Sequence, residues 1–390
     1  MYADNISATC RQLLAIKSPS SHLVNFSNIG SYTGLISSEI NSWKGSLMRK
    51  SALIAASLGI ALTLSACAAE EPAEDVAEET TTETESEEAP TGRDAWPESL
   101  VFTLTPSQEA GGLIETAEPL AALLEAELGV EIEPLVPSDY AGVIAALASG
   151  QAQIAGGLGP NQMVQAEDQA DATLILQAER FGSFTYVTQW LTNDPDTYCD
   201  DTPVADEDGY LFCNGVQDAT DASDGPIGAD KLPLLAGQTV SFVDQGSTSG
   251  YLIPSLQLLE AGVDPVDDIN VVFAGGHDAS VQAVYDGDAV VGTSYNDARG
   301  AIAETSPDVG ERVVVWGWSG PIPNDGFAVA GDLPEDLKQA ITDAFVSIAS
   351  TEEGQALMQE LYSIDNVKPV EDGVYEVIRQ LDVQLGDILG

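Results

Sequence analysis

Short apolar runs and amphipathic stretches alternate along the chain from residue 100 onward. The runs LVFTL, VEIEPLV, AQIAGG and TLILQAE, between residues 100 and 179, are typical of buried strands. Between them, GLIETAEPLAALLEAELG and SDYAGVIAALASG have apolar residues at helical spacing and end at glycines; Ser138 or Asp139 is the expected N-cap of the second helix. This alternation predicts an α/β fold with a mainly parallel sheet.

The same pattern resumes after residue 237. QTVSFVDQG, INVVFAGG, DAVVGTS and VVVWGWSGPIP are predicted strands, and PEDLKQAITDAFVSIAS, TEEGQALMQELYS and VYEVIRQLDVQLGDIL are predicted helices. The helix end, glycine turn and strand of AALASGQAQIAG (145–156) are echoed by AVYDGDAVVGT (283–293). We therefore expect two α/β halves of similar plan to face each other across a cleft.

The segment from 193 to 230 lacks strong periodicity. It contains Cys199, Cys213 and many aspartates, but no lysine or arginine, which predicts an inserted surface loop. The run DEDG (206–209) hints at calcium but lacks the spacing of an EF-hand loop. A solvated acidic loop without a metal is the favoured interpretation.

Composition restricts the possible partners. The chain has 390 residues, enough for two or three domains. Its 63 acidic and 13 basic residues give a formal net charge of −50. This balance argues against nucleic acid and against an anionic membrane surface as binding partners.

The N-terminal part is predicted to be a processing signal followed by a tether. MRK at 48–50 is a second plausible start, so residues 1–47 are interpreted as a mis-assigned upstream segment. A basic start, a short apolar run and small residues make 48–66 typical of a secretory signal peptide. The run LSAC resembles a bacterial lipobox, in which Cys67 would receive lipid; an uncleaved membrane anchor is the alternative. The acidic, Thr/Glu-rich residues 67–96 are predicted to be a disordered tether.

This interpretation places the protein outside the cytoplasm and constrains the cysteines. Cys10 lies in the upstream segment, and Cys67 is the predicted site of lipidation. In an oxidising compartment, the remaining Cys199 and Cys213 are expected to form a disulfide.

The stretch DQGSTSGYLIP (244–254) is the strongest chemical signal. Ser247, Thr248 and Ser249 lie between two glycines where a predicted strand turns into a helix. An anion in so acidic a protein must be held by local donors, and hydroxyls beside the free N–H groups of a helix N-terminus supply them. An ordinary Ser/Thr helix cap is the alternative.

Two enzyme or nucleotide motifs fail on spacing in this stretch. A P-loop needs a lysine after its last glycine, where Tyr251 stands. A nucleophile elbow needs serine at the position that Thr248 occupies. Neither motif is therefore predicted.

His277 is the only histidine after residue 48. It follows the predicted strand INVVFAGG, at the carboxyl end where α/β folds place ligand contacts, and Asp278 is the expected cap of the next helix. Its imidazole would suit the same oxyanion. A histidine in a surface loop is the alternative.

Five motifs occur in an order that resembles a known family. SDYAGVIAALASGQAQIAGGLGP is followed by STSGYLIPSLQLLEAGVDP, then His277, SYND and GPIPND. The chain thereby resembles the phosphate/phosphite/phosphonate-binding proteins of ABC importers from about residue 100 to its C-terminal helices. The acidic cysteine loop is not part of that resemblance.

The resemblance implies a type II periplasmic-binding-protein-like fold with two α/β lobes, a ligand cleft and a hinge. Lobe 1 would comprise 97–187 and 321–390, and lobe 2 would comprise 188–320, with crossovers near 188–195 and 317–322. The expected protein is a monomeric capture protein without a cofactor, a metal or catalysis. Its partners would be a small phosphorus oxyanion, an ABC permease and an ATPase, with a membrane anchor through Cys67.

The resemblance also implies roles for individual residues. The three hydroxyl residues would grip the oxyanion with help from His277, and two carboxylates would hold an aminophosphonate's ammonium. Asp297 stands where a glutamate is expected. Carboxylates only accept hydrogen bonds, so they favour a protonated or ammonium-bearing ligand and disfavour sulfate. The full set of expected ligand-binding residues is Ser247, Thr248, Ser249, His277, Tyr140, Asp297, Asp325, Tyr186 and Thr105.

Two alternatives of different kinds remain at this point. The first is a binding protein of the same fold for another small solute, such as a sulfonate or an amine. The second is a secreted serine hydrolase that uses Ser249 and His277. Binding of the other solute would favour the first, and ester turnover would favour the second.

Overall fold

The computed structural model describes residues 92–389. The predicted upstream segment (1–47), the signal peptide (48–66), Cys67 and the tether up to residue 91 lie outside the described residues. At the end of the predicted tether, Gly92–Ala95 form a short 3₁₀ turn and Trp96 packs against a hydrophobic core.

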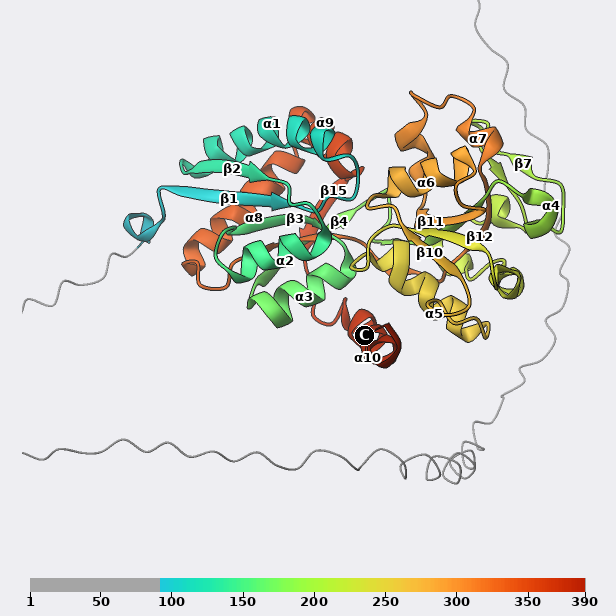
Figure 1. The fold of residues 1–390 in the computed structure, drawn as a ribbon. Coiled ribbons are helices and arrows are strands. Elements are labelled where there is room, and N and C mark those ends of the chain that lie inside the picture. Colours follow the sequence, from blue (N-terminus) through green and yellow to red (C-terminus); the bar gives the residue numbers. More distant parts are fainter. Residues whose placement is uncertain (1–91, 390) are drawn as a thin grey trace, which may run out of the picture. The chain divides into compact units, whose positions relative to one another are not determined.

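The described chain forms two α/β lobes, each built around one sheet (Figure 1). The sheet of lobe 1 has the strand order β15-β4-β14-β3-β1-β2, and helices cover both of its faces. α1, α8 and α9 pack on one face, and α2 and α3 on the other. The strands are β1 (Ser99–Leu104), β2 (Glu131–Leu135), β3 (Ile154–Leu158), β4 (Thr173–Glu179), β14 (Gly326–Val329) and β15 (Asn366–Pro369). The helices are α1 (Ala110–Leu128), α2 (Tyr140–Ala148), α3 (Pro160–Ala170), α8 (Glu335–Ala349) and α9 (Glu352–Tyr362).

The core of lobe 1 follows from the alternation of side chains along its central strands. On β14, Phe327 contributes to one core and Ala328 to the other, because successive side chains point to opposite faces. Gly156 of β3 makes room for the aromatic side: a Cβ there would lie 2.8 Å from the Phe327 ring and 2.9 Å from the Phe102 ring. Small and large residues therefore interlock across the sheet.

Lobe 2 contains a seven-stranded sheet in the order β10-β9-β11-β6-β12-β8-β7. Its core buries the aromatic rings of Trp190 and Trp316, whose centroids lie 5.6 Å apart. The strands are β6 (Thr188–Thr192), β7 (Val204–Ala205), β8 (Leu211–Phe212), β9 (Thr239–Phe242), β10 (Asn270–Phe273), β11 (Val291–Tyr295) and β12 (Val314–Trp318). The helices are α4 (Pro195–Tyr198), α5 (Ile253–Glu260), α6 (His277–Asp286) and α7 (Val309–Arg312).

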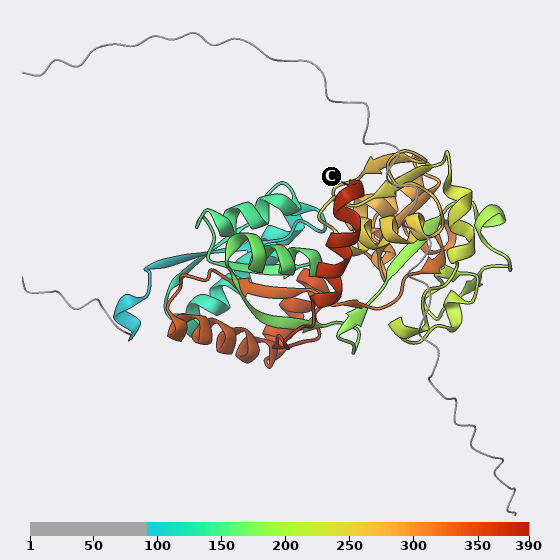
Figure 2. The ribbon, with the colours of Figure 1, turned by 90° about the horizontal axis from the view of Figure 1, so that it is seen from below.

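Two short strands carry the chain between the lobes. β5 (Thr185–Tyr186) and β13 (Ile322–Pro323) pair in antiparallel fashion. The C-terminal helix α10 (Glu376–Leu389) then lies along both lobes (Figure 2). It places Ile378 in a core of lobe 1 and Leu381 in the core of lobe 2.

The prediction of mainly parallel sheets is wrong. β14 pairs antiparallel with both β3 and β4, and β6 pairs antiparallel with both β11 and β12. The reason is the crossing of the chain: β6 enters lobe 2 from lobe 1 and β14 returns from lobe 2. The neighbours of β6 and β14 belong to strand–helix–strand units within one lobe. β6 and β14 therefore run antiparallel to these neighbours. Several elements between the predicted ones, such as α3 and β6, were not anticipated.

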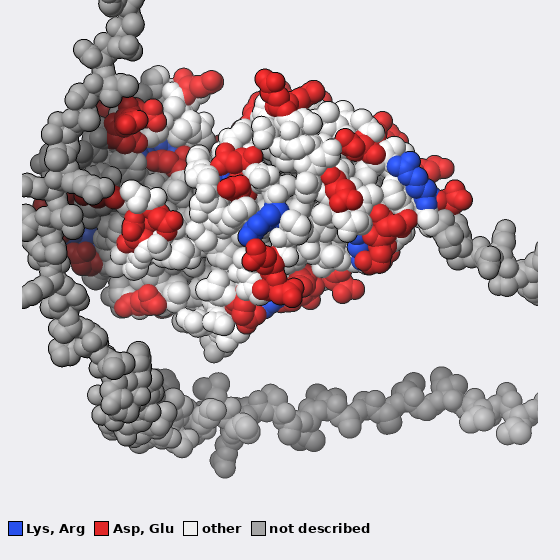
Figure 3. Space-filling model, turned by 180° about the vertical axis from the view of Figure 1, so that it is seen from behind, with Lys and Arg blue, Asp and Glu red and all other residues white. Residues whose placement is uncertain are grey.

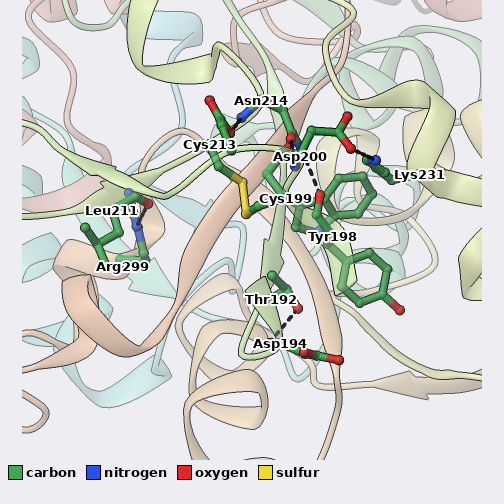
Figure 4. Close-up of a disulfide and its surroundings, with 12 residues drawn as sticks. Thr192, Asp194, Tyr198, Cys199, Asp200, Leu211, Cys213, Asn214, Lys231 and Arg299 are labelled. Carbon is green, nitrogen blue, oxygen red and sulfur yellow. Dashed lines mark hydrogen bonds and ion pairs between the residues drawn. A yellow bond between two sulfur atoms is a disulfide. The ribbon is translucent and has the colours of Figure 1, made fainter. Parts of the chain in front are cut away.

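The insertion of residues 193–230 is more than a surface loop. Cys199 and Cys213 are joined by a disulfide with a Cα–Cα distance of 5.7 Å (Figure 4). Phe212 of β8 pairs with Val315 of β12, so the insertion extends the sheet. Tyr198 stacks on Trp316 with ring centroids 5.4 Å apart. These contacts give the acidic segment an apolar inner side that its composition does not reveal.

Among the charged side chains on the face that Figure 3 shows, carboxylates far outnumber lysines and arginines. Within residues 92–389, none of the helices combines the length and the apolar character needed to span a membrane.

Candidate functional site

A small cavity of about 30 Å³ is enclosed by residues from both lobes. This volume exceeds the roughly 10–15 Å³ that one water needs, so the cavity has room for groups of about the size of a water. Eight of the nine residues expected to bind ligand line it: Thr105, Tyr140, Tyr186, Ser247, Thr248, Ser249, His277 and Asp325. The other lining residues are Ser107, Gln108, Gly157, Gly159, Arg180, Tyr295 and Tyr362.

Ser247, Thr248 and Ser249 lie where the chain enters a helical segment. One turn of π-helix (η6, Thr248–Leu252) leads directly into α5, and Ser247 is its N-cap. Gly250 lets this segment approach strand β9, because a Cβ there would lie 2.4 Å from a Val243 methyl carbon. All three hydroxyl residues are buried, so their polar groups face the cavity or the protein interior rather than bulk water.

The serine and threonine hydroxyls retain protons for a ligand. Ser247 Oγ accepts the N–H of Gly250 at 3.1 Å, and Thr248 Oγ1 accepts the N–H of Asn161 at 2.9 Å. A hydroxyl that accepts such a bond still has its own O–H to donate. The arrangement therefore offers donors to an oxyanion. The bond from Asn161 also joins the lobes, because Asn161 belongs to α3 of lobe 1.

Thr105 contributes to the cavity in a different way from the one expected. Its hydroxyl donates to Oε1 of Gln162 at 3.0 Å, so its proton is not directed at a ligand. Tyr362 donates its hydroxyl to the Thr105 carbonyl at 2.9 Å. Thr105 was expected to donate a hydrogen bond to the ligand. The structure corrects this expectation, because Thr105 lines the wall of the cavity and donates to Gln162.

His277 begins α6 and is a neutral donor. Its Nδ1 accepts the N–H of Tyr295 at 3.3 Å and lies 3.1 Å from Ser294 Oγ. Because a backbone N–H only donates, Nδ1 carries no proton and Nε2 carries it. Burial, followed by the charge of Arg180, lowers the pKa of His277 to about 3. The N-cap of α6 is Gly276, not Asp278 as expected; Asp278 instead accepts the N–H of Glu109 across the cleft at 3.2 Å.

We expect His277 to lower the stability of the protein as the pH falls below about 6.5. Its pKa in the folded state lies below its ordinary value of 6.5, so between pH 6.5 and about 3 the unfolded chain binds a proton that the folded chain does not. Between pH 6.5 and 5 the free energy of unfolding should fall by about 2 kcal/mol through this group. Well above pH 6.5 neither state binds the proton, so the group contributes no pH dependence there.

Denaturant unfolding of the wild type and His277→Gln at several pH values would measure this contribution. The carboxylates titrate in both proteins and cancel in the difference. Stability curves that run parallel between pH 6.5 and 5 would contradict the buried, neutral histidine.

The cavity contains one carboxylate and one guanidinium. Asp325 follows β13, and its Oδ2 lies 3.3 Å from Nη1 of Arg180, which follows β4. Burial raises the pKa of Asp325, and the charge of Arg180 opposes that rise. Arg180 was not anticipated. A basic residue directly after a predicted strand of a strongly acidic chain was the signal that could have identified it.

Tyrosine side chains complete the wall. The hydroxyl of Tyr140 lies against Ser247, and that of Tyr186 against Ser249. Burial raises the pKa of both phenols, so they stay neutral donors. Neutral rings and hydroxyls exclude water from a bound anion without repelling it.

Asp297 lies outside the cavity. Its carboxylate accepts hydrogen bonds from Nε and Nη2 of Arg299, and the distance from Nη2 to Oδ2 is 2.5 Å. Its Oδ1 also accepts the N–H of Arg299 at 3.0 Å, which caps a short 3₁₀ helix (η7, Ala298–Ile302). The sequence predicted that Asp297 faces the ligand. The structure corrects this prediction, because Asp297 forms an ion pair with Arg299 outside the cavity.

Among residues 92–389, histidine, cysteine, aspartate and glutamate side chains do not gather in any group of three or more that could hold a metal ion. The donors of the cavity are hydroxyls, one imidazole and one guanidinium. Such a set suits an anion rather than a cation.

Comparison with known proteins gives one consistent family. A family model described as "ABC transporter, phosphonate, periplasmic substrate-binding protein" matches residues 102–375. The Phosphate-import protein PhnD of Mycolicibacterium smegmatis is 26% identical over 308 residues, which cover 75% of this chain and 87% of that protein. The Phosphonates-binding periplasmic protein of Escherichia coli is 23% identical over 275 residues, which cover 70% of this chain and 73% of that protein.

A solved structure shares the fold. PhnD1 from Prochlorococcus marinus, in complex with methylphosphonate, matches with a TM-score of 0.60 and 16% sequence identity. The match covers 75% of this chain and 99% of that protein. This chain thus shares its two-lobed α/β fold with PhnD1.

Proposed function

Because the chain belongs to the periplasmic substrate-binding proteins of phosphonate ABC transporters, we propose that it captures a tetrahedral oxyanion of phosphorus between its lobes. Phosphate, phosphite and phosphonates are the candidate ligands. The closed, loaded protein delivers the ligand to an ABC permease and its ATPase. One chain closes on one ligand, so the protein works as a monomer.

The observation that carries this proposal is the hydroxyl cluster at the entry to η6. Ser247, Thr248 and Ser249 meet His277 at one small cavity, in a chain whose net charge repels anions. Pre-aimed neutral donors at a helix N-terminus bind a tetrahedral anion through hydrogen bonds and the helix dipole. The relatives named for phosphate import and for phosphonate binding support this choice of ligand class.

Asp325 supports a protonated ligand. A carboxylate accepts hydrogen bonds only, so a ligand O–H is favourable beside it and a fully deprotonated oxygen is not. Hydrogen phosphate carries such a proton near neutral pH and sulfate does not. The same residue thereby disfavours sulfate.

The geometry offers no support for a hydrolase. A serine hydrolase needs a histidine hydrogen-bonded to the nucleophile. The hydrogen bonds of the His277 ring go to Ser294 and to the Tyr295 N–H, not to Ser249. Capture without turnover is the function that the residues of this cavity favour.

The proposal includes a lipid anchor on Cys67, which the lipobox-like LSAC motif supports. In cells, the wild type should sediment with membranes and a Cys67→Ser chain should not. Equal membrane retention of both would replace the lipid anchor with an uncleaved apolar segment.

The ligand class is tested by calorimetric titration of the chain from residue 68 onward. Phosphate, phosphite, methylphosphonate, 2-aminoethylphosphonate, sulfate and methanesulfonate are titrated at one fixed salt concentration. Binding of a phosphorus oxyanion without binding of sulfate is expected. Binding of methanesulfonate alone would favour a sulfonate carrier of the same fold, and no binding by any phosphorus compound would refute the proposal.

A further inference from the structure

Arg180 is the one lysine or arginine among the residues that line the cavity. It stands immediately after β4, where Arg180 and Ser183 exchange two backbone hydrogen bonds of 2.9 and 3.0 Å. Phe181 and Gly182 form the tip of this tight turn with φ values of 51° and 71°. The turn thereby directs the chain back toward the hinge and leaves the Arg180 side chain at the cleft.

Arg180 and Asp325 form a pair within lobe 1. The Asp325 carbonyl accepts the N–H of Ala178, which ties the aspartate to β4 at 2.9 Å. Both partners therefore come from segments next to neighbouring strands of one sheet, and lobe 1 alone supplies the whole pair.

The guanidinium group of Arg180 is almost fully buried. Its residue is 5% exposed, its side chain lies over the Tyr295 ring of lobe 2 at 4.7 Å, and its Nε is buried without a hydrogen-bond partner. A guanidinium can donate five hydrogen bonds, and it is suited to the oxygens of tetrahedral anions. Arg180 thus has donor capacity left after its bond to Asp325.

Charges in the cavity decide which ligand it accepts. Asp325 is the only carboxylate among the lining residues, and Arg180 already neutralises it. A ligand ammonium would have to displace a preformed guanidinium–carboxylate pair and lie close to a like charge. A compact anion meets the free donors of Arg180 instead.

We propose that Arg180 determines the substrate class of this site: a compact tetrahedral phosphorus oxyanion without a cationic substituent, such as phosphate, phosphite or methylphosphonate, in preference to an aminoalkylphosphonate. This inference rests on the proposed function and narrows it. It also revises the role that the sequence suggested for Asp325, because that carboxylate holds the protein's own guanidinium rather than a ligand's ammonium.

Calorimetric titration tests this inference in the wild type and in Arg180 variants. We expect the wild type to bind at least one of the three compact ions at least about 100-fold more tightly than 2-aminoethylphosphonate, since a buried like charge is strongly unfavourable. In Arg180→Gln, the affinity for the compact ion should fall by about 100-fold. The affinity for 2-aminoethylphosphonate should not fall, so the ratio of the two affinities should approach one. Arg180→Lys should keep the discrimination because it keeps the charge.

Two controls separate specificity from folding. Arg180→Gln/Asp325→Asn removes both charges and leaves no unpaired buried carboxylate; it should also lose the discrimination. Arg312→Gln removes an exposed arginine that likewise stacks on a tyrosine (Tyr285, 4.0 Å) but lies outside the cavity. This variant should keep the wild-type ratio.

The outcomes distinguish the inference from the proposed function. If the wild type binds 2-aminoethylphosphonate as tightly as the compact ions, or if Arg180→Gln keeps the wild-type ratio, the inference is overturned and capture of phosphorus oxyanions stands. If no phosphorus compound binds, both are overturned.

Discussion

The variant Ser247→Ala/Ser249→Ala should bind the captured oxyanion about 100- to 10,000-fold more weakly than the wild type. Both serines are buried and line the cavity in which the proposed anion would bind. A hydrogen bond to a charged group contributes about 1.5–3 kcal/mol, and each 1.4 kcal/mol changes the dissociation constant about tenfold. Isothermal titration calorimetry with the tightest ligand of the wild type measures the loss.

Controls for this variant address the fold as well as the site. Ser247 is also an N-cap, and its replacement by alanine should cost about 1 kcal/mol of stability. Ser249→Ala alone leaves that cap intact and should still lose about tenfold or more in affinity. Ser223→Ala/Ser350→Ala removes two exposed hydroxyls and should bind like the wild type. An unchanged affinity in the Ser247→Ala/Ser249→Ala protein would show that the hydroxyls are only a helix cap.

Replacing Arg299 should cause a large loss of stability. Its side chain is fully buried and paired with Asp297. It also donates to the carbonyls of Leu211 (2.9 Å, Figure 4) and Val313 (2.8 Å). It therefore joins the acidic insertion to the sheet of lobe 2. Arg299→Met should lower the free energy of unfolding by about 3–5 kcal/mol, because a partly buried carboxylate and two carbonyls lose their partner.

Denaturant unfolding followed by tryptophan fluorescence measures this effect. Arg312→Met, at an exposed arginine, should change stability by less than about 1 kcal/mol. Asp297→Asn should leave the affinity for the oxyanion unchanged, because Asp297 lies outside the cavity. A loss of affinity in Asp297→Asn at wild-type stability would restore Asp297 to the binding site.

Local patterns in the sequence predicted much of the fold. The strand at TLILQAE corresponds to β4 residue for residue, and Asp139 is the N-cap of α2 as expected. Hydrophobic periodicity and helix caps depend on residues close together in the chain, so they can be recognised in a single sequence. The direction of β6 and β14 is not local, because it depends on where the chain crosses between the lobes. The mixed sheets could therefore not be predicted from alternation alone.

The cavity was predictable where residues cluster in sequence and less so elsewhere. Ser247, Thr248 and Ser249 are consecutive, and their glycine neighbours mark the turn that presents them. Asp297 and Asp325 looked equivalent in sequence, since each follows a predicted strand. The structure separates them by their arginine partners: one pair is buried beside the acidic insertion, and the other lines the cavity.

The α/β class, the hydroxyl cluster and the family resemblance could all be predicted, because each depends on residues that are neighbours along the chain. The contact between Arg180 and Asp325 could not, because these residues are far apart in sequence and come within 3.3 Å only in the folded protein. A guanidinium beside a carboxylate changes the charge that a ligand encounters, and that distance depends on which strands are adjacent in the sheet. The charge that a ligand would meet in this cavity thus depends on long-range packing, which the motif that identifies the family does not encode.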